Sequence, residues 1–219
     1  VAGIVERLGL SGRHRLFDPF VGAGTTLVAA RAHGLPAAGT DLSPLAVFST
    51  RVKVRSYSAN ALRACWAKLR RAVPGEPPAV PPSRVPLLRR AFPLAAWQWF
   101  VCLRQLLPLA EPPHRAFFLL ALLRAMRQVC SARSDGGWLR WTESALEGAD
   151  LPDRFAAMVE EMIGDVDLSS RFWRENGSNY RVWVADARQT PAGGPYDAVI
   201  CSPPYPNRHD YTRVFAPEL

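Results

Sequence analysis

The sequence lacks the cysteine and histidine spacings that build metal sites and disulfide frameworks. No Cys-x-x-Cys pair occurs, and the histidines show no ligand spacing. The four cysteines are Cys65, Cys102, Cys130 and Cys201. We therefore expect no metal ion, and the absence of a disulfide framework favours a cytoplasmic location.

Long apolar runs are missing as well. The N-terminus has no signal-peptide core, and the most apolar stretch, residues 92–110, is interrupted by Gln98, Arg104, Gln105 and Pro108. Such a stretch is too polar to span a bilayer, so we expect no membrane partner.

Acidic residues are scarce between residues 51 and 140. This stretch holds sixteen Lys or Arg against Glu76, Glu111 and Asp135, a net charge of +13, whereas the rest of the chain holds eleven basic and sixteen acidic residues. Arginine-rich codon usage explains why arginine replaces lysine, but it does not remove acids. A basic block in an acidic frame is typical of a nucleic-acid-contacting part on a separate scaffold.

Strand and helix patterns alternate on both sides of this block. Strands are expected at 14–20, 36–41, 180–186 and 196–202, and helices at 25–34, 43–73, 94–107, 114–130 and 152–163. A proline-rich connector at 73–86 and a glycine-centred loop at 131–141 complete the pattern. The order predicts an α/β fold with an open parallel sheet, and about 130 residues separate its second strand from its third.

The first motif, FDPFVGAGTT, places Gly22 and Gly24 in a strand-to-helix turn, where a ligand can lie against the backbone and the helix offers free N–H groups. Asp41 follows Gly22 by nineteen positions and ends the next strand, where an acid can hold ribose hydroxyls. Leu27 stands where a dinucleotide site would have its third glycine, and no P-loop is present. A cofactor with an adenosine, a carboxylate and no phosphates fits best, which indicates S-adenosylmethionine.

The second motif, ICSPPY, ends an apolar strand with Ser202-Pro203-Pro204-Tyr205. Two prolines stop the sheet ladder and fix the chain direction. The Ser202 hydroxyl and the Pro203 carbonyl can then accept hydrogen bonds from an amino group, while Tyr205 stacks on an extruded base. A C5-cytosine mechanism would need a nucleophilic cysteine after proline, and none of the four has that setting.

Together, DPFVGAGTT, GTDLSP and ICSPPY resemble the motifs of the amino-directed DNA methyltransferases, which methylate cytosine N4 or adenine N6 and include restriction-modification enzymes. The resemblance implies a Rossmann-like fold of seven strands and S-adenosylmethionine as cofactor. It implies cofactor contacts by Asp18, Phe20, Gly22, Gly24, Thr25, Asp41 and Asp186, and a catalytic corner of Ser202, Pro203, Pro204 and Tyr205. A leading serine in that corner is more often linked to cytosine N4.

The division of the chain follows from the motifs. Residues 1–50 are expected to form the cofactor-binding half, 51–175 a basic helical insertion that contacts DNA, and 176–219 the third and fourth strands with the catalytic motif. Only four of seven strands are visible, so we expect a fragment with weak or no activity by itself, and a second polypeptide is a candidate source of the missing strands.

Three basic residues are candidates for nucleic-acid contacts. Arg208 and Arg213 lie in NRHDYTR, which is either a loop that closes on DNA or a solvated loop. Arg140 lies between Trp138 and Trp141, which either stack on bases or anchor a loop to the core.

The functional alternatives are N6-adenine methylation, an RNA guanine-N2 methyltransferase, and a non-catalytic nucleic-acid-binding module on a methyltransferase frame.

Overall fold

The computed structural model describes residues 1–135, 138–141, 150–170, 173, 180–189 and 193–203. These residues form two compact units. Unit 1 comprises residues 1–56 and the described residues from 168 to 203, and unit 2 comprises the described residues from 57 to 167.

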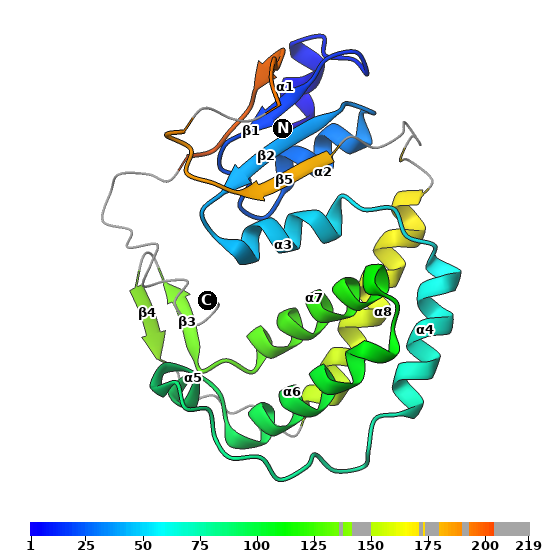
Figure 1. Ribbon diagram of the computed structural model, residues 1–219, viewed down its shortest axis with the longest axis vertical. Helices are drawn as coiled ribbons and strands as arrows, with labels where there is room; N and C mark the ends of the chain where they lie inside the picture. Colours follow the sequence, from blue (N-terminus) through cyan, green and yellow to red (C-terminus); the bar gives the residue numbers. More distant parts are fainter. Residues whose placement is uncertain (136–137, 142–149, 171–172, 174–179, 190–192, 204–219) are drawn as a thin grey trace. The chain divides into compact units, whose positions relative to one another are not determined.

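Unit 1 is built on a parallel sheet of four strands (Figure 1). The strands are β1 (Leu16–Asp18), β2 (Ala37–Asp41), β5 (Tyr180–Val184) and β6 (Ala198–Val199). Their order is β5-β2-β1-β6, and every neighbouring pair is parallel. The α/β class, the four strands and their interruption by a long helical segment are confirmed.

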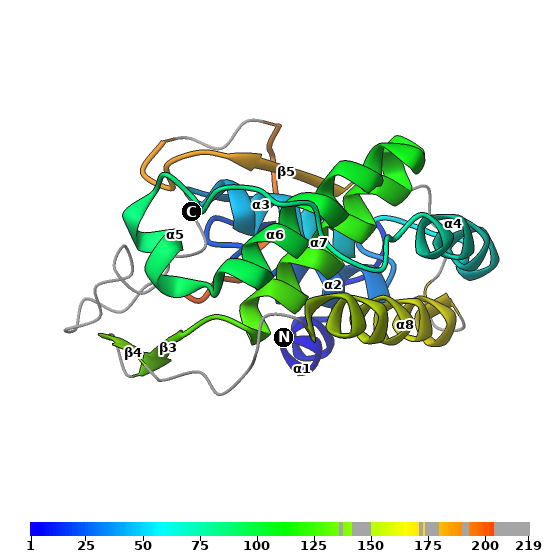
Figure 2. The same cartoon turned by 90° about the horizontal axis from the view of Figure 1, so that it is seen from below.

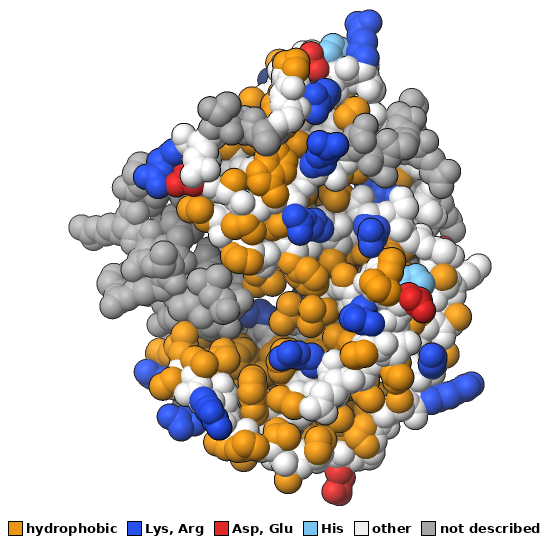
Figure 3. Space-filling view, in the orientation of Figure 1, with side chains coloured by type: hydrophobic (Ala, Val, Ile, Leu, Met, Phe, Trp, Pro, Cys, Tyr) orange, Lys and Arg blue, Asp and Glu red, His pale blue; other side chains and the backbone are white. Residues whose placement is uncertain are grey.

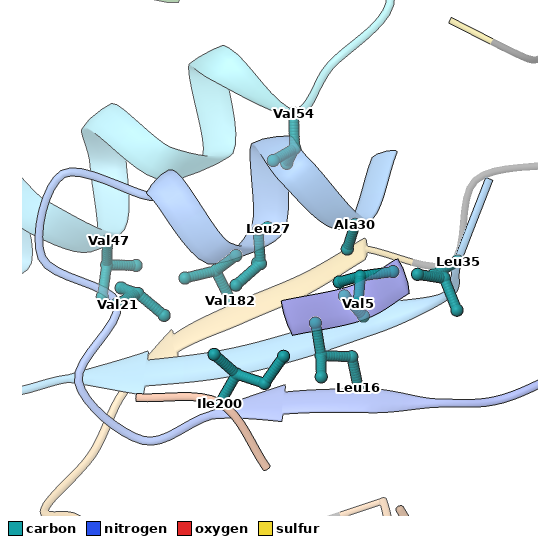
Figure 4. Packing of buried hydrophobic residues seen from close by; sticks show 11 residues of the cluster. Val5, Leu16, Val21, Leu27, Ala30, Leu35, Val47, Val54, Val182 and Ile200 are labelled. Atoms are coloured by element: carbon teal, nitrogen blue, oxygen red, sulfur yellow. The ribbon is translucent and has the colours of Figure 1, made fainter. Parts of the chain in front are cut away.

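Three helices contribute apolar side chains to the core of unit 1. They are α1 (Ala2–Arg7), α2 (Thr25–Ala32) and α3 (Pro44–Lys53). Figure 4 shows Val5 from α1, Leu27 from α2 and Val47 from α3 pointing toward Val182 and Leu16 of the sheet. This packing fixes the glycine turn between β1 and α2 relative to the strand ends.

The expected continuous helix over 43–73 is wrong, because the chain breaks between Lys53 and Ala59. Two serines start separate helices. The Ser43 hydroxyl accepts from the Ala46 N–H and caps α3, and the Ser58 hydroxyl accepts from the Ala61 N–H and caps α4 (Ala59–Arg71). Serine at an N-cap satisfies a backbone donor that the helix leaves open.

Unit 2 is mainly helical. Besides α4 it contains α5 (Pro86–Ala91), α6 (Leu94–Leu106), a 3-10 helix (Leu107–Leu109), α7 (Pro112–Gln128) and most of α8 (Leu151–Ser170). Helices α6 and α7 pack on each other (Figure 2). Trp66 of α4, Phe118 of α7 and Phe155 of α8 form a shared aromatic cluster.

Two boundaries in unit 2 differ from the expectation. Helix α5 forms at the end of the segment expected to be an extended connector, with Pro86 at its start, where proline is tolerated. Helix α8 continues to Ser170 rather than ending near residue 163, since Gly164 is accommodated within the helix. No helix in the described part of the chain is long and apolar enough to cross a membrane.

The expected loop over 131–141 is instead an antiparallel hairpin of β3 (Ala132–Asp135) and β4 (Trp138–Trp141). Asp135 pairs with Trp138, and the sequence between them is Gly-Gly, a frequent two-residue hairpin connection. Trp141 packs against a small cluster of Ala91, Cys130 and Ala132. The Arg90 guanidinium lies 3.9 Å from the centre of the Trp141 ring. For Trp141, anchoring to the core is the role observed.

Candidate cofactor and target-base site

The carboxyl ends of the four parallel strands meet at one edge of the sheet. Asp18 ends β1 and Asp41 ends β2, while Asp186 follows β5 and Ser202 follows β6 by a few residues. The strand order reverses at β1, with β2 and β5 on one side and β6 on the other. In open α/β sheets, ligands bind outside the carboxyl ends at such a reversal.

Asp41 organises the glycine turn. Its Oδ2 accepts a hydrogen bond of 2.9 Å from the Gly22 N–H, and its Oδ1 accepts one of 2.8 Å from the Ser43 N–H. The residue is half-buried. A carboxylate has about four acceptor positions, so Asp41 retains capacity for the hydroxyl groups of a ligand.

The two predicted turn glycines have different physical roles. Gly24 is buried and has φ of +85°, and a Cβ there would lie 2.7 Å from Thr50 Oγ1. Gly22 is exposed with φ of +48°, and the nearest atom to a Cβ there would be 3.9 Å away. Gly24 therefore permits close packing on α3, whereas Gly22 leaves the outer surface of the turn open.

The start of α2 faces the same turn. Gly24 is its N-cap residue, and no described side chain makes a capping hydrogen bond there. Thr25, the first helical residue, is exposed, and Phe20 is half-buried. A helix start of this kind offers backbone N–H groups and a partial positive charge to a carboxylate.

Asp18 is only 3% exposed. Its Oδ1 accepts a 2.9 Å hydrogen bond from the Phe20 N–H. Burial raises the pKa of this carboxyl, hydrogen bonds with Thr26 and Phe20 oppose the rise, and the nearby Asp41 charge adds to it. Asp18 thus holds the turn from inside, and its direct contact with a cofactor stays a prediction.

Three residues that support the turn were not singled out by the sequence. A Cβ at Gly39 would overlap Val21 Cγ1 and lie 2.6 Å from the Asp18 carbonyl oxygen. Lys53 Nζ donates a 2.7 Å hydrogen bond to the Ala23 carbonyl, and Thr50 Oγ1 donates one of 3.4 Å to the Gly22 carbonyl. The available signal was the three-residue spacing of Thr50 and Lys53, which puts both on one face of a helix.

The Asp186 carboxylate is bound by Arg188. The Arg188 backbone N–H donates to Asp186 Oδ1 at 3.0 Å, and the guanidinium contacts both carboxylate oxygens. The hydrogen bonds from the Arg188 side chain and backbone lower the pKa of Asp186 to about 2. The predicted contact of Asp186 with an adenine amino group would compete with this guanidinium.

The catalytic corner begins where β6 stops pairing. The Ile200 N–H donates a 3.1 Å hydrogen bond to the Phe17 carbonyl, and Cys201, Ser202 and Pro203 are exposed beyond it. Pro204 and Tyr205 lie outside the described residues, as do Arg208 and Arg213. Arg140 is exposed on β4 in unit 2. Over the described ranges no group of three His, Cys, Asp or Glu residues could hold a metal ion.

Known proteins resemble the chain over nearly its whole length. The type II methyltransferase M.BsoBI of Geobacillus stearothermophilus is 23% identical over 250 residues, which cover 100% of this chain and 49% of that protein. M.AvaI of a Nostoc species is 27% identical over 244 residues, or 94% of this chain and 47% of that protein. The chain is similar to these type II methyltransferases. The predicted resemblance to the DNA methyltransferases is thereby confirmed.

A third type II methyltransferase, M.MvaI of Kocuria varians, is 49% identical over 39 residues, or 18% of this chain. No family model and no solved structure matches the chain. The chain spans about half the length of M.BsoBI and M.AvaI. These type II methyltransferase similarities do not distinguish cytosine N4 from adenine N6, and they give no support to a second polypeptide.

Proposed function

We propose that this chain forms the cofactor-binding and catalytic part of an S-adenosylmethionine-dependent DNA methyltransferase that modifies an exocyclic amino group, with cytosine N4 as the first candidate. The observation that carries the proposal is the shared edge of the sheet, to which the strand order brings the glycine turn, Asp41 and the Ser202-Pro203 corner. The similarity to type II methyltransferases supports it.

The residues at this edge fit the cofactor. The exposed face at Gly22 leaves room for a ligand on the backbone, and the uncapped start of α2 suits its carboxylate. Asp41 suits the ribose hydroxyls, with the Gly22 N–H fixing the direction of its carboxylate. When bound, the cofactor supplies a methyl group attached to a positively charged sulfur. Transfer of the methyl group breaks the carbon–sulfur bond, and the rest of the cofactor leaves as a neutral thioether.

The catalytic corner prepares the target nitrogen. The lone pair of an exocyclic amino group is delocalised into the base, so the nitrogen is a poor nucleophile. Two acceptors, Ser202 Oγ and the Pro203 carbonyl, would each accept a hydrogen bond from one N–H of the amino group and favour a tetrahedral nitrogen with its lone pair free. One of these two protons leaves the nitrogen when the methyl group bonds to it, so the methylated amino group is neutral. Positioning and electrostatics of this kind need no covalent intermediate. Stacking of the base on Tyr205 belongs to the same proposal.

The proposed DNA contacts lie in the basic segment 51–175, with 1–50 holding the cofactor and 176–219 the catalytic motif. Figure 3 shows more lysine and arginine than acidic side chains among the coloured residues. Arg133 and Arg140 are register partners across the β3–β4 hairpin. A two-stranded ribbon fits the major groove of DNA, where Arg140 would contact a phosphate or a guanine. Arg208 and Arg213 remain candidates for the same role.

The decisive experiment is a product assay. The intact protein is incubated with methyl-labelled cofactor and DNA, and the DNA is digested to nucleosides. We expect label in N4-methylcytosine, and Ser202→Ala should reduce it strongly while leaving cofactor binding unchanged. Label in N6-methyladenine would assign the other amino group, and label only with RNA would refute the DNA proposal. Tight DNA binding by wild-type protein with no transfer would favour the non-catalytic alternative.

A further inference from the structure

A shallow groove of about 510 Å³ lies on unit 2 between α4 and α8, which run side by side in Figures 1 and 2. Its lining residues are Arg63, Trp66, Ala67, Arg70, Arg71 and Glu160. Positions 63, 67, 70 and 71 share one face of α4, since position 67 lies four residues after 63 and three or four residues before 70 and 71. The opposite face of α4 buries Leu62 and Leu69. The amphipathic pattern of α4 thus turns arginines outward along the groove.

The charge of the groove is positive. Three guanidinium groups stand against the single carboxylate of Glu160. Arg63 is partly neutralised by Asp167 at 3.4 Å, with both side chains about half exposed. The side chains of Arg70 and Arg71 are exposed and have no interaction partner among the described residues. Two arginines therefore remain available to a ligand.

One residue that lines the groove, Trp66, carries a hydrogen-bond donor without an acceptor among the described residues. Trp66 is 5% exposed, packs against Phe118 and Phe155, and has a buried indole N–H with no acceptor in the described part of the chain. A buried donor left unpaired costs about 1–3 kcal/mol. A ligand oxygen that reached the floor of the groove would supply the missing acceptor.

We propose that this groove binds phosphates of a nucleic-acid backbone. Guanidinium groups and an indole N–H are all donors, and phosphate oxygens are acceptors that pair strongly with arginine. The seven residues from Arg63 to Arg70 correspond to about 10 Å along the helix axis, a length over which a duplex presents several phosphates. A polymer backbone therefore matches the row of arginines better than a single free phosphate ion does.

The proposal rests on the proposed function, because it names a contact for the same DNA partner. It is tested with the full chain, a fluorescent DNA duplex and anisotropy titrations at several salt concentrations. The test variant is Arg70→Gln/Arg71→Gln, which removes two exposed charges and keeps the Arg63–Asp167 pair. Each lost phosphate contact should reduce the slope of log affinity against log salt by about 0.9, so the double variant should lose about 1.8.

The control variant is Arg7→Gln/Arg13→Gln. Both residues are exposed, lie in unit 1 outside the basic block, and remove the same charge. If the control lowers the slope as much as the groove variant does, the effect is one of net charge and the groove assignment is wrong. If wild-type protein binds no DNA although it binds the cofactor, both the groove and the DNA partner of the proposed function are refuted.

A variant of Trp66 and two competition measurements extend the test. Trp66→Phe keeps the ring and removes only the N–H, so it should weaken DNA binding by about two- to tenfold while thermal unfolding confirms the fold. An unchanged affinity would show that the indole N–H does not bind the DNA.

Inorganic phosphate at millimolar concentration should displace no more of the duplex than chloride does at the same ionic strength. Displacement by phosphate beyond that level would assign the groove to free phosphate. Tighter binding of an RNA duplex would assign it to RNA.

Discussion

At the scale of single residues, the glycine turn depends on contacts that a side chain would destroy. Gly24 has a left-handed backbone conformation and lies against Thr50, while Gly39 lies against Val21 and the Asp18 carbonyl. The carboxylates of Asp18 and Asp41 hold the backbone N–H groups of Phe20 and Gly22. The turn is therefore fixed before any ligand arrives, which lowers the entropy lost on binding.

Gly24→Ala should destabilise the protein. A left-handed conformation costs an L-residue about 1–2 kcal/mol, and the overlap with Thr50 adds to that cost. The matched control is Gly164→Ala in α8, where a Cβ would meet nothing within 4 Å. It should raise the free energy of unfolding by about 0.5–1 kcal/mol. Urea denaturation measures both, and equal effects of the two substitutions would contradict this account of the turn.

Asp18 should make the free energy of unfolding depend measurably on pH. Its pKa is raised by burial above the ordinary value of 3.8, so the folded state favours the protonated carboxyl. Its contribution to stability is complete below that ordinary value and is lost as pH rises through the raised pKa. Asp18→Asn should abolish this loss, whereas Asp18→Ala should cost about 1–3 kcal/mol by leaving the Phe20 N–H unpaired. Thermal unfolding from pH 3 to 8 provides the test, and parallel pH profiles of wild type and Asp18→Asn would refute it.

At the scale of elements, α3 and the β3–β4 hairpin lie outside the four-stranded sheet, and each is held by contacts with neighbouring elements. Helix α3 reaches the glycine turn through Thr50 and Lys53, and it is tied to β5 by a 2.7 Å hydrogen bond from Arg51 Nε to the Val182 carbonyl. The hairpin is tied to α5 by Trp141 and Arg90 and to α7 by Arg127, which donates to the Ala132 carbonyl. Contacts with neighbouring elements therefore hold both α3 and the hairpin in place.

Arg90→Gln should loosen the hairpin. A cation held over an indole ring contributes about 0.5–2 kcal/mol, so amide hydrogen exchange of β3 and β4 should become roughly two- to thirtyfold faster. Arg89→Gln is the control, since this neighbouring residue of α5 is also exposed but contacts no ring in the described structure. Equal exchange rates in the two variants would show that the Arg90–Trp141 contact does not hold the hairpin.

At the scale of the whole molecule, the structure changes how the charge is distributed. Residues 51–140 carry a net charge of +13, but unit 2, residues 57–167, holds fourteen basic and eleven acidic residues. Most of the difference arises from eight acids after residue 140, and five of them lie in α8, where Asp167 pairs with Arg63 and Glu161 with Arg124. The cations that remain, among them Arg70 and Arg71, are the ones that matter for a polyanion.

Substitution of Asp41 should weaken cofactor binding, whereas added salt should weaken DNA binding. Asp41→Ala removes the acceptor for the Gly22 and Ser43 N–H groups, so cofactor affinity should fall at least tenfold while DNA affinity is retained. Raising salt should weaken DNA binding steeply and cofactor binding little, because the cofactor has no phosphates. Calorimetry measures the first affinity and anisotropy the second. Equal loss of both in Asp41→Ala would contradict the proposed division of labour.

Local sequence determines much of the secondary structure of unit 1. Four strands, a strand–glycine–helix turn and an acid at the next strand end are fixed by short-range patterns, and all four strands form. Two of them are shorter than expected, because β1 covers only Leu16–Asp18 of 14–20 and β6 only Ala198–Val199 of 196–202. Local sequence also carries the signal for the hairpin, which is Gly-Gly between two short strands, and the signal for the break before α4, which is Ser58 at the N-cap of that helix.

The remaining features required the tertiary structure. Three features depend on contacts between segments far apart in the chain. Strand β6 lies beside β1 rather than β5, Thr50 and Lys53 reach the glycine turn, and α8 neutralises part of the basic block. Local propensity carries no information about such partners, because they are selected by which apolar faces bury each other. The sequence by itself determined the chemistry at each strand end, and the packing of the sheet decided that these groups share one edge.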